Sequence, residues 1–293
     1  MRALVVGPPP ATTDFLRGWQ ANSHDPALAL SGVELLYNPG APLMQLADPP
    51  HILVSQMGTT FASTAPFAIP LAAVAAGDLG PHPILLAGPS LHHDGGAGAW
   101  RNLSVDQRNR LTHAAGQLTI APLRQDALLG VHARSSQLAA ISGDQHRGAG
   151  VDRAISNFYS AHQWVYDTGE LLRIARQPGT AMAGGVVMLL AALGASVTPA
   201  VTALCEYYNW PKQLTQADVV IILSHADSAE VTVDPVITEV AKLAAAAILP
   251  CAVVARDHQL PRRTFASLGV SDLYTRGNRS WKEMGAALAQ TWR

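Results

Sequence analysis

The stretch from Leu85 to Trp100 has the sequence Leu-Leu-Ala-Gly-Pro-Ser-Leu-His-His-Asp-Gly-Gly-Ala-Gly-Ala-Trp and carries the most informative pattern of the chain. The apolar run Ile84–Ala87 predicts a strand that enters a glycine-rich turn, with helix or coil after it. Glycine adopts positive φ and lets a ligand come close to main-chain N–H groups. Asp94 would hold a metal ion, bind a sugar-like hydroxyl or cap its own turn, and spacing alone leaves these three roles open.

Composition excludes several functional classes. The chain has 293 residues, 48% of them hydrophobic and 14% charged, which is enough for a large core in one or two domains. The net charge of −1 gives neither the basic surface typical of nucleic-acid binding nor a polybasic membrane patch. Cys205 and Cys251 lie in apolar contexts and indicate a reducing compartment, without a disulfide framework.

No segment of the sequence predicts targeting or membrane insertion. The apolar residues after Arg2 are too few for a signal peptide. The longest apolar run, Ala181–Ala195, is shorter than the roughly 18 residues that suggest a spanning helix. We therefore expect a soluble, cytoplasmic protein that acts on a small molecule and binds neither nucleic acid nor membrane; a homodimer is left open.

Hydrophobic patterning predicts strands and helices in alternation. The expected strands are Ala3–Val6, Val33–Tyr37, 52–54, Ile84–Ala87, Asp218–Leu223, Ala252–Ala255 and Asp272–Thr275. The expected helices are 14–21, 63–76, 104–115, 152–175, 182–193, 235–247 and 280–292. The proline-rich segment Asn38–Pro50 is interpreted as a linker. The alternation in the last third favours a doubly wound α/β structure.

Polar residues at predicted strand ends are candidates for chemistry. His92 and His93 are adjacent, so in an extended segment at most one of them would face a cleft. Either would be a base or a metal ligand, or simply a solvated loop histidine. His225 and Asp227 follow a buried strand, at the end where ligands bind in open α/β sheets. No zinc spacing, P-loop or dinucleotide fingerprint is present, and no metal site is expected.

The segment His93–Gly98 follows an apolar strand and Gly88, and it resembles the Asn-Asp-Gly-Gly-Ala-Gly end of the signature of bacterial class I glycerate kinases. Further stretches are similar to motifs of that family in the same order, and the resemblance spans roughly residues 52 to 255. They are Ser63-Thr64, Ala127-Leu128-Leu129-Gly130, Ala181-Met182-Ala183-Gly184-Gly185, Ala217-Asp218-Val219-Val220-Ile221 and Pro250-Cys251-Ala252-Val253-Val254-Ala255.

The resemblance implies an α/β fold with two domains. A Rossmann-like domain would consist of residues 1–48 plus 198–293, so that both chain ends contribute to it. A middle domain, residues 49–197, would carry the glycine-rich loop. The active site would lie in the cleft between the two domains.

Several charged family motifs are missing, and the chain is identified as a shortened and diverged member. Where the family has Ala-Pro-Asp-Ser-Phe-Lys-Gly-Ser, this chain has prolines at 8–10, without the acid or the lysine. The family's Asp-Gly-Gly-Glu-Gly loop has no counterpart. Its Gly-Glu-Gly-Arg-Leu-Asp loop is replaced by residues 223–228, and Asp126 stands for the Asn of Asn-Pro-Leu-Leu-Gly. Phosphoryl transfer depends on such charges.

Two hypotheses follow. The first is an enzyme that uses ATP and Mg²⁺ to phosphorylate D-glycerate or a related hydroxy acid. The second is a catalytically inactive glycerate-kinase fold that acts as a binding or regulatory module. Basic residues decide between them, because a kinase needs one of Arg124, Arg256, Arg262 or Arg263 to converge with Asp94.

The candidate site residues fall into three groups. Catalytic roles are predicted for Asp94, His93, His225 and Asp227. Substrate contacts are predicted for Ser90, Gly95, Gly96 and Asp126. Arg256 is predicted to contact a phosphate; its alternative is a surface ion pair with Asp257.

Overall fold

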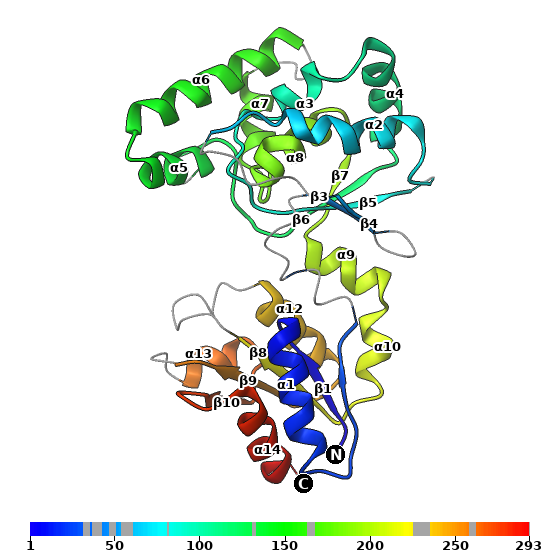
Figure 1. Ribbon diagram of the computed structural model, residues 1–293, viewed down its shortest axis with the longest axis vertical. Helices are drawn as coiled ribbons and strands as arrows, with labels where there is room; N and C mark the ends of the chain where they lie inside the picture. Colours follow the sequence, from blue (N-terminus) through cyan, green and yellow to red (C-terminus); the bar gives the residue numbers. More distant parts are fainter. Residues whose placement is uncertain are drawn as a thin grey trace. The chain divides into compact units, whose positions relative to one another are not determined.

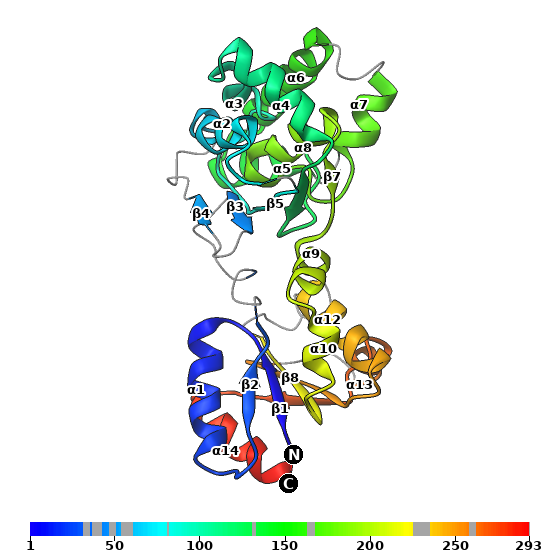
Figure 2. The same ribbon diagram turned by 90° about the vertical axis from the view of Figure 1, so that its right-hand side faces the viewer.

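The computed structural model describes residues 1–31, 36, 43–46, 51–53, 61–80, 82–130, 133–162, 168–224, 235–257 and 262–292. The chain divides into two compact units (Figures 1 and 2). One, which we call the terminal unit, consists of Met1–Asn38 and Leu204–Arg293; the other, the middle unit, is Pro39–Ala203. Each contains a sheet of its own with helices packed around it.

The sheet of the terminal unit is parallel, with the strand order β10-β9-β8-β1-β2. The strands are β1 (Ala3–Val6), β2 (Ala27–Ala29), β8 (Val219–Leu223), β9 (Cys251–Ala255) and β10 (Asp272–Thr275). Every residue of β1, β8 and β9 is buried, as expected for apolar strands in a parallel sheet covered on both faces. The helices are α1 (Pro9–Gln20), α10 (Trp210–Leu214), α12 (Pro235–Ala246), α13 (Arg262–Ser267) and α14 (Trp281–Thr291).

The sheet of the middle unit is mixed and has the order β4-β3-β5-β6-β7. Its strands are β3 (Leu43–Leu46), β4 (His51–Leu53), β5 (Ile84–Ala87), β6 (Thr119–Pro122) and β7 (Ser196–Val197). β3 pairs antiparallel with β4 and β5, whereas β5, β6 and β7 run parallel.

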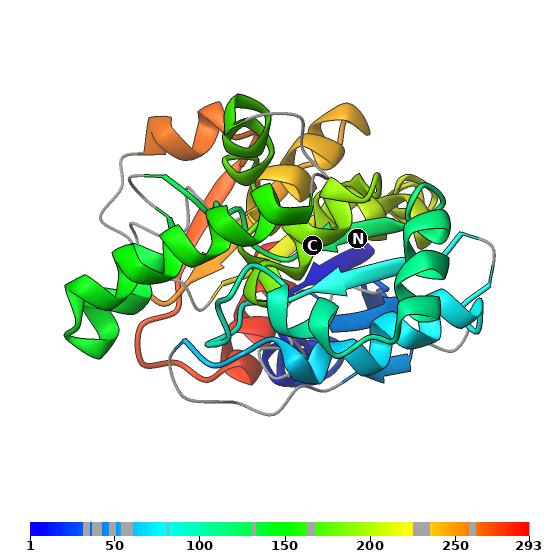
Figure 3. The same ribbon diagram turned by 90° about the horizontal axis from the view of Figure 1, so that it is seen from above.

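Helices fill and cover the middle unit. They are α2 (Ala68–Ala76), α3 (Ala97–Arg101), α4 (Val105–Ala115), α5 (Arg134–Ser142), α6 (Gln145–His162), α7 (Thr168–Ala175) and α8 (Val186–Ala192), with 3₁₀ turns η2 (Ala65–Phe67) and η3 (Met182–Gly185). Residues 186–190 of α8 are fully buried in the core, whereas the long helix α6 runs along the outside (Figures 1 and 3). A further helix, α9 (Ala200–Tyr207), includes the division between the two units.

The predicted α/β class with parallel strands is confirmed, but several element boundaries differ. β3 lies inside the segment predicted to be a linker. α1 begins at Pro9 instead of Asp14, because proline fits the first turn of a helix. The strand after α1 is β2, and the predicted strand Val33–Tyr37 falls almost entirely outside the described residues. Within the described ranges, no helix is both long and apolar enough to cross a membrane.

Of the two long predicted helices, one lies partly outside the described residues and the other begins differently from the prediction. The predicted helix 152–175 corresponds to α6 and α7, with residues 163–167 outside the description. The predicted helix 182–193 begins as η3, because Ala183 and Gly184 have positive φ values of 50° and 68°. This turn allows the segment before α8 to pass against the glycine-rich loop.

Ile248, just after α12, is an exposed β-branched residue in the left-handed region, with φ of 57° and 91% of its surface exposed. Left-handed backbone costs an L residue about 1–2 kcal/mol and costs glycine almost nothing. We expect Ile248→Gly to raise the free energy of unfolding by about 1 kcal/mol in urea titration. The control Ala247→Gly has no such strain to relieve and should lower the free energy of unfolding. Equal effects of the two substitutions would contradict the explanation by backbone strain.

Candidate functional site

The candidate site lies in the middle unit, where β5 and β6 end. The two strands are parallel, with Ala87 paired to Pro122, so the loops that follow them emerge at the same edge of the sheet. That edge is where open α/β sheets bind ligands. The loop after β5 carries residues 88–96, and the loop after β6 begins at residue 123.

Asp94 is the centre of a dense hydrogen-bond network. Its Oδ1 accepts from Thr64 Oγ1 (2.5 Å) and Gly96 N (3.1 Å). Its Oδ2 accepts from Ser63 Oγ, Thr64 N and Gly98 N, each at 3.0 Å. A carboxylate has about four lone-pair positions, so five protein donors already fill it. The structure thus gives Asp94 a positioning role, and its contact with a substrate stays a prediction.

The backbone amides of the glycine-rich loop are also occupied within the protein. Each N–H of residues 95–99 donates to an acceptor of the middle unit: Gly95 N to Gly184 O (3.0 Å), Gly96 N to Asp94 Oδ1 (3.1 Å), Ala97 N to Asp94 O (3.3 Å), Gly98 N to Asp94 Oδ2 (3.0 Å) and Ala99 N to Thr64 Oγ1 (3.1 Å). No amide in this run remains for a bound phosphate. Substrate contact by Gly95 and Gly96 stays a prediction that these N–H groups do not support.

The glycines have a packing role that explains their presence. Gly95 and Gly96 have φ of 70° and 82°, and their segment crosses η3 closely. A Cβ on Gly185 would lie 2.5 Å from Gly95 Cα, and a Cβ on Gly184 would lie 2.7 Å from the carbonyl oxygen of His92. The hydroxyl of the buried Tyr159 donates to Gly95 O at 2.7 Å. Two glycine-rich segments far apart in the sequence therefore form one rigid crossing.

Both histidines of the loop are buried. His92 Nδ1 lies 2.8 Å from Ser90 Oγ, and burial lowers the pKa of His92. His93 is 1% exposed and packs edge-on against Phe61, and its two ring nitrogens have no partner in the described part of the chain. Burial, followed by the positive charge of Arg134, lowers the pKa of His93 to about 4, although Asp94 acts in the opposite direction. His93 is therefore neutral at pH 7.

The low pKa of His93 predicts a pH-dependent stability. Between pH 6.5 and about 4 the unfolded chain binds a proton at His93 that the folded chain does not bind. This contribution is complete above pH 6.5 and is lost as the pH falls toward 4. From pH 7 to pH 5, urea titration should show the wild type losing about 2 kcal/mol more than His93→Leu.

Exposed His82 supplies the control for this experiment. His82→Leu should retain the pH dependence of the wild type. Equal losses in wild type and His93→Leu between pH 7 and pH 5 would show that His93 is not a buried neutral imidazole.

A cluster of charges surrounds the loop after β6. Burial lowers the pKa of Arg134, the negative charge of Asp126 raises it and the positive charge of Arg124 lowers it, so both side chains lie within electrostatic range of Arg134. His93 experiences both Arg134 and Asp94, which connects this cluster to the glycine-rich loop. Arg134 was not among the basic residues selected from the sequence; it places positive charge within electrostatic range of His93, as Asp94 places negative charge there.

A pocket of about 600 Å³ adjoins this cluster. It is lined by residues of the loop after β6, by the start of α5 and by the residue after α7: Gln125, Asp126, Ala127, Leu129, Gly130, Ala133, Gln137 and Arg176. The carboxylate of Asp126 accepts no hydrogen bond within the described ranges, so it is available to a ligand.

The predicted residues Arg256, His225 and Asp227 do not belong to the middle unit. Arg256 is exposed after β9, in the terminal unit. His225 and Asp227 lie outside the described residues, so their roles stay predictions. In the described ranges no group of three or more His, Cys, Asp or Glu side chains could hold a metal ion.

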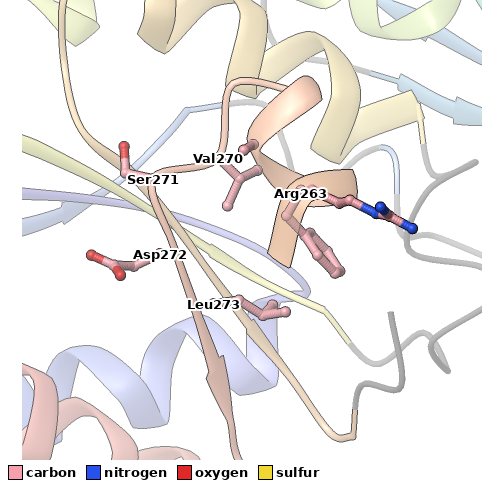
Figure 4. A pocket seen from close by; sticks show the side chains of 7 residues that line it. Arg263, Val270, Ser271, Asp272 and Leu273 are labelled. Carbon is pink, nitrogen blue, oxygen red and sulfur yellow. The ribbon is translucent and has the colours of Figure 1, made fainter. Parts of the chain in front are cut away.

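A second pocket, of about 340 Å³, lies between α13 and β10 of the terminal unit (Figure 4). Phe265 and Val270 contribute apolar surface to it. Its two charged lining residues, Arg263 and Asp272, point to opposite sides in Figure 4. Charged groups therefore do not converge in this pocket as they do beside Arg134.

Comparisons with known proteins agree with this architecture. The crystal structure of a protein provisionally assigned as glycerate kinase 2 from Salmonella typhimurium LT2 covers 99% of this chain and 98% of its own, with a TM-score of 0.61 and 13% identity. At 13% identity this structural similarity establishes the fold of the chain alone. No curated protein sequence matches the chain significantly. The model of the glycerate kinase family matches residues 143–291, just over half of the chain. The chain therefore belongs to the glycerate kinase family.

Proposed function

We propose that this protein is a class I-type kinase that transfers the γ-phosphoryl group of ATP to a hydroxyl of D-glycerate or of a related hydroxy acid. The observation that carries the proposal is the charged cluster at the carboxyl edge of the middle sheet. Asp126 and Arg124 act electrostatically on Arg134, and Arg134 and Asp94 both act electrostatically on His93. The sequence named Arg124, Arg256, Arg262 and Arg263 as the arginines of which one must converge with Asp94; Arg134, which was not among them, supports the proposal because it and Asp94 both act on His93.

The cluster contains the groups that phosphoryl transfer needs. Positive side chains stabilise the charge that develops on the transferred group, and a carboxylate accepts the proton of the attacking hydroxyl. We assign that acceptor to Asp126, because the oxygens of Asp94 already accept five hydrogen bonds. His93 is a weaker candidate, because its side chain is only 1% exposed and both of its ring nitrogens are buried, whereas Asp126 lines a pocket.

ATP and Mg²⁺ are part of the proposal. ATP would supply the phosphoryl group, and Mg²⁺ would neutralise the developing charge on its phosphates. Mg²⁺ bound with a nucleotide takes most of its ligands from phosphate and water oxygens and needs only one or two carboxylates. The described residues therefore fit a metal that the nucleotide brings; they do not form a resident metal cage. Phosphate binding by Arg256 remains a prediction.

The test is an activity assay on the purified chain. We expect D-glycerate with Mg²⁺-ATP to yield ADP and phosphoglycerate, with the product identified by mass spectrometry. Asp126→Asn should lower kcat by roughly 100-fold or more, whereas the control Asp78→Asn removes a charge from an exposed site on the same unit and should leave kcat unchanged.

Binding by itself is measured by thermal shift. A ligand at a hundredfold excess over its Kd stabilises the folded state by roughly 2.7 kcal/mol. Absence of both a thermal shift with Mg²⁺-ATP and turnover of any hydroxy acid would overturn the proposal and favour a binding module with the same fold.

A further inference from the structure

β10 forms one edge of the sheet in the terminal unit, and this edge is open. Among the described residues, β10 pairs with β9 and with no other strand (Figure 1). Its residues are half-buried or exposed, whereas every residue of β9 is buried. At the opposite edge of the sheet, Ala27 of β2 is only 2% exposed. An open edge is a template for a further extended chain, so β10 is the strand that such a chain would join.

The N–H and C=O groups of Leu273 and Thr275 point away from β9. In a parallel pair, residues that bond to the neighbouring strand alternate with residues that face away. Ala255 O accepts from Arg276 N at 2.8 Å, so Arg276 and, two residues before it, Tyr274 face β9. Leu273 and Thr275 face outward, and in the part of the chain that the structure describes neither forms a hydrogen bond outside this strand pair. Two N–H groups and two C=O groups therefore remain for another strand.

Charges flank these groups symmetrically. Asp272 and Arg276 lie two residues before and two residues after Tyr274, and alternate residues of a strand share a face. That face packs toward α14, because Tyr274 borders the core cluster that contains Trp281, and Arg276 Cζ lies 4.9 Å from the ring centroid of Trp281. Figure 4 shows the side chains of Asp272 and Leu273 on opposite sides of β10. An acid and a base thus stand at equal distances from Tyr274 on one face.

We propose that a second copy of this chain pairs with β10 in antiparallel orientation, with a two-fold axis beside Tyr274. In this register Leu273 of each copy lies opposite Thr275 of the other, and each such pair forms two hydrogen bonds. Asp272 of each copy lies opposite Arg276 of the other, so both charge pairs are attractive. The sheets of the two terminal units then continue into each other across the axis.

The symmetry of this pattern selects a second copy over an unrelated peptide. A two-fold interface needs a surface that is complementary to itself. Here donors meet acceptors and acids meet bases when the strand is opposed by its own sequence, reversed about Tyr274. A register shifted by two residues would set Asp272 opposite Tyr274 and would leave Arg276 without its acid.

Arg276 is held in place and keeps donors for the second copy. Its Nη1 donates to Arg279 O at 2.5 Å, and its guanidinium stacks on Trp281. Its Nη2 donates to no acceptor, and its buried Nε has no partner, within the described ranges. Fixing one arginine nitrogen in advance lowers the entropy cost of the charge pair.

A strand at this edge would also cover apolar surface. On the side of β10 away from α14, Leu273 lines the 340 Å³ pocket together with Phe265 and Val270 (Figure 4). One short strand pair buries less than the roughly 1,200 Å² typical of stable complexes. We therefore expect a dimer that dissociates in the micromolar range.

Sedimentation equilibrium of the full chain tests the proposal. As its concentration rises, the wild type should pass from 30.9 kDa to the mass of two chains. Thr275→Pro removes an outward N–H that β9 does not use, and it should raise the dimer Kd roughly 10- to 100-fold. The matched control Thr275→Val keeps this N–H and should dimerise like the wild type.

Two charge variants test the register. Asp272→Arg and Arg276→Asp should each dimerise about 10-fold more weakly, because like charges then face each other in both pairs. Mixed together, the two variants should form a heterodimer with nearly the affinity of the wild type, since every acid again meets a base. Asp78→Arg makes the same charge change at an exposed site of the middle unit and should leave the dimer unchanged.

Three results would overturn the proposal. They are a wild type that stays monomeric at millimolar concentration, a dimer that Thr275→Pro leaves intact, and charge variants that stay monomeric when they are mixed. The proposed kinase function does not depend on these results, because turnover is measured separately on the same wild-type chain.

Discussion

Asp94→Ala is expected to lower the free energy of unfolding by about 3 kcal/mol and to reduce the yield of folded protein. The substitution removes an acceptor from three backbone amides, those of Thr64, Gly96 and Gly98, and from two hydroxyl groups. The hydroxyls can rotate to new partners, but the amides are fixed and each would need water. Chemical denaturation with a fluorescence readout gives the difference directly.

Two further variants separate packing from charge. Asp94→Asn keeps the shape of the side chain but turns an N–H donor toward other N–H donors. We therefore expect it to be less stable than the wild type but more stable than Asp94→Ala. Asp78→Ala removes a carboxylate from an exposed position and should change stability by less than about 0.5 kcal/mol. If Asp94→Ala melted like the wild type and lost only turnover, Asp94 would be a catalytic group, as the sequence pattern had predicted.

The elements that the sequence predicted well have strong local signals. Ser104 and Gln107 form the expected capping box, with both reciprocal hydrogen bonds, and α4 begins where they predict. The apolar strands β5 and β8 also lie within the predicted ranges. β3 was missed because the composition of its surroundings indicates a linker, whereas its pairing with β5 is a tertiary interaction.

Arg134 was missed for a different reason. α5, which begins at Arg134, was not predicted, because its apolar pattern is weak. One signal was available: Gly143 ends that helix with φ of 71°, a common C-terminal cap. The electrostatic contact of Arg134 with His93 and Asp126, however, depends on the tertiary packing of the loops after β5 and β6. No local sequence pattern encodes that packing.

The glycine motifs show how a correct pattern can support an incomplete interpretation. The sequence pointed to Gly95 and Gly96 as residues that leave space for a ligand, and Gly184-Gly185 appeared only as part of a separate motif before a helix. In the structure the two segments leave space for each other, because Gly95 N donates to Gly184 O and a Cβ on Gly185 would overlap Gly95. The residue spacing within either motif does not predict that the two motifs pack against each other.

This crossing predicts the second large effect. Gly185→Ala should lower the free energy of unfolding by about 3 kcal/mol. One part is backbone strain, since Gly185 has φ of 96°, and the other is overlap, since the new Cβ would lie 2.5 Å from Gly95 Cα and 3.0 Å from Leu128 Cδ1. Neither contact can yield easily, because the backbone of Gly95 is held by Gly184 O and Tyr159.

Gly194→Ala isolates the overlap from the strain. Gly194 has a similar φ of 102°, but a Cβ there would meet nothing within 4 Å. It should therefore lose only about 1 kcal/mol, the cost of the left-handed backbone alone. The difference between the two variants, about 2 kcal/mol in urea titration, measures the close packing of the glycine segments. Equal losses would mean that the segments can separate by the width of a methyl group, and the loop would then be free to take a ligand between them.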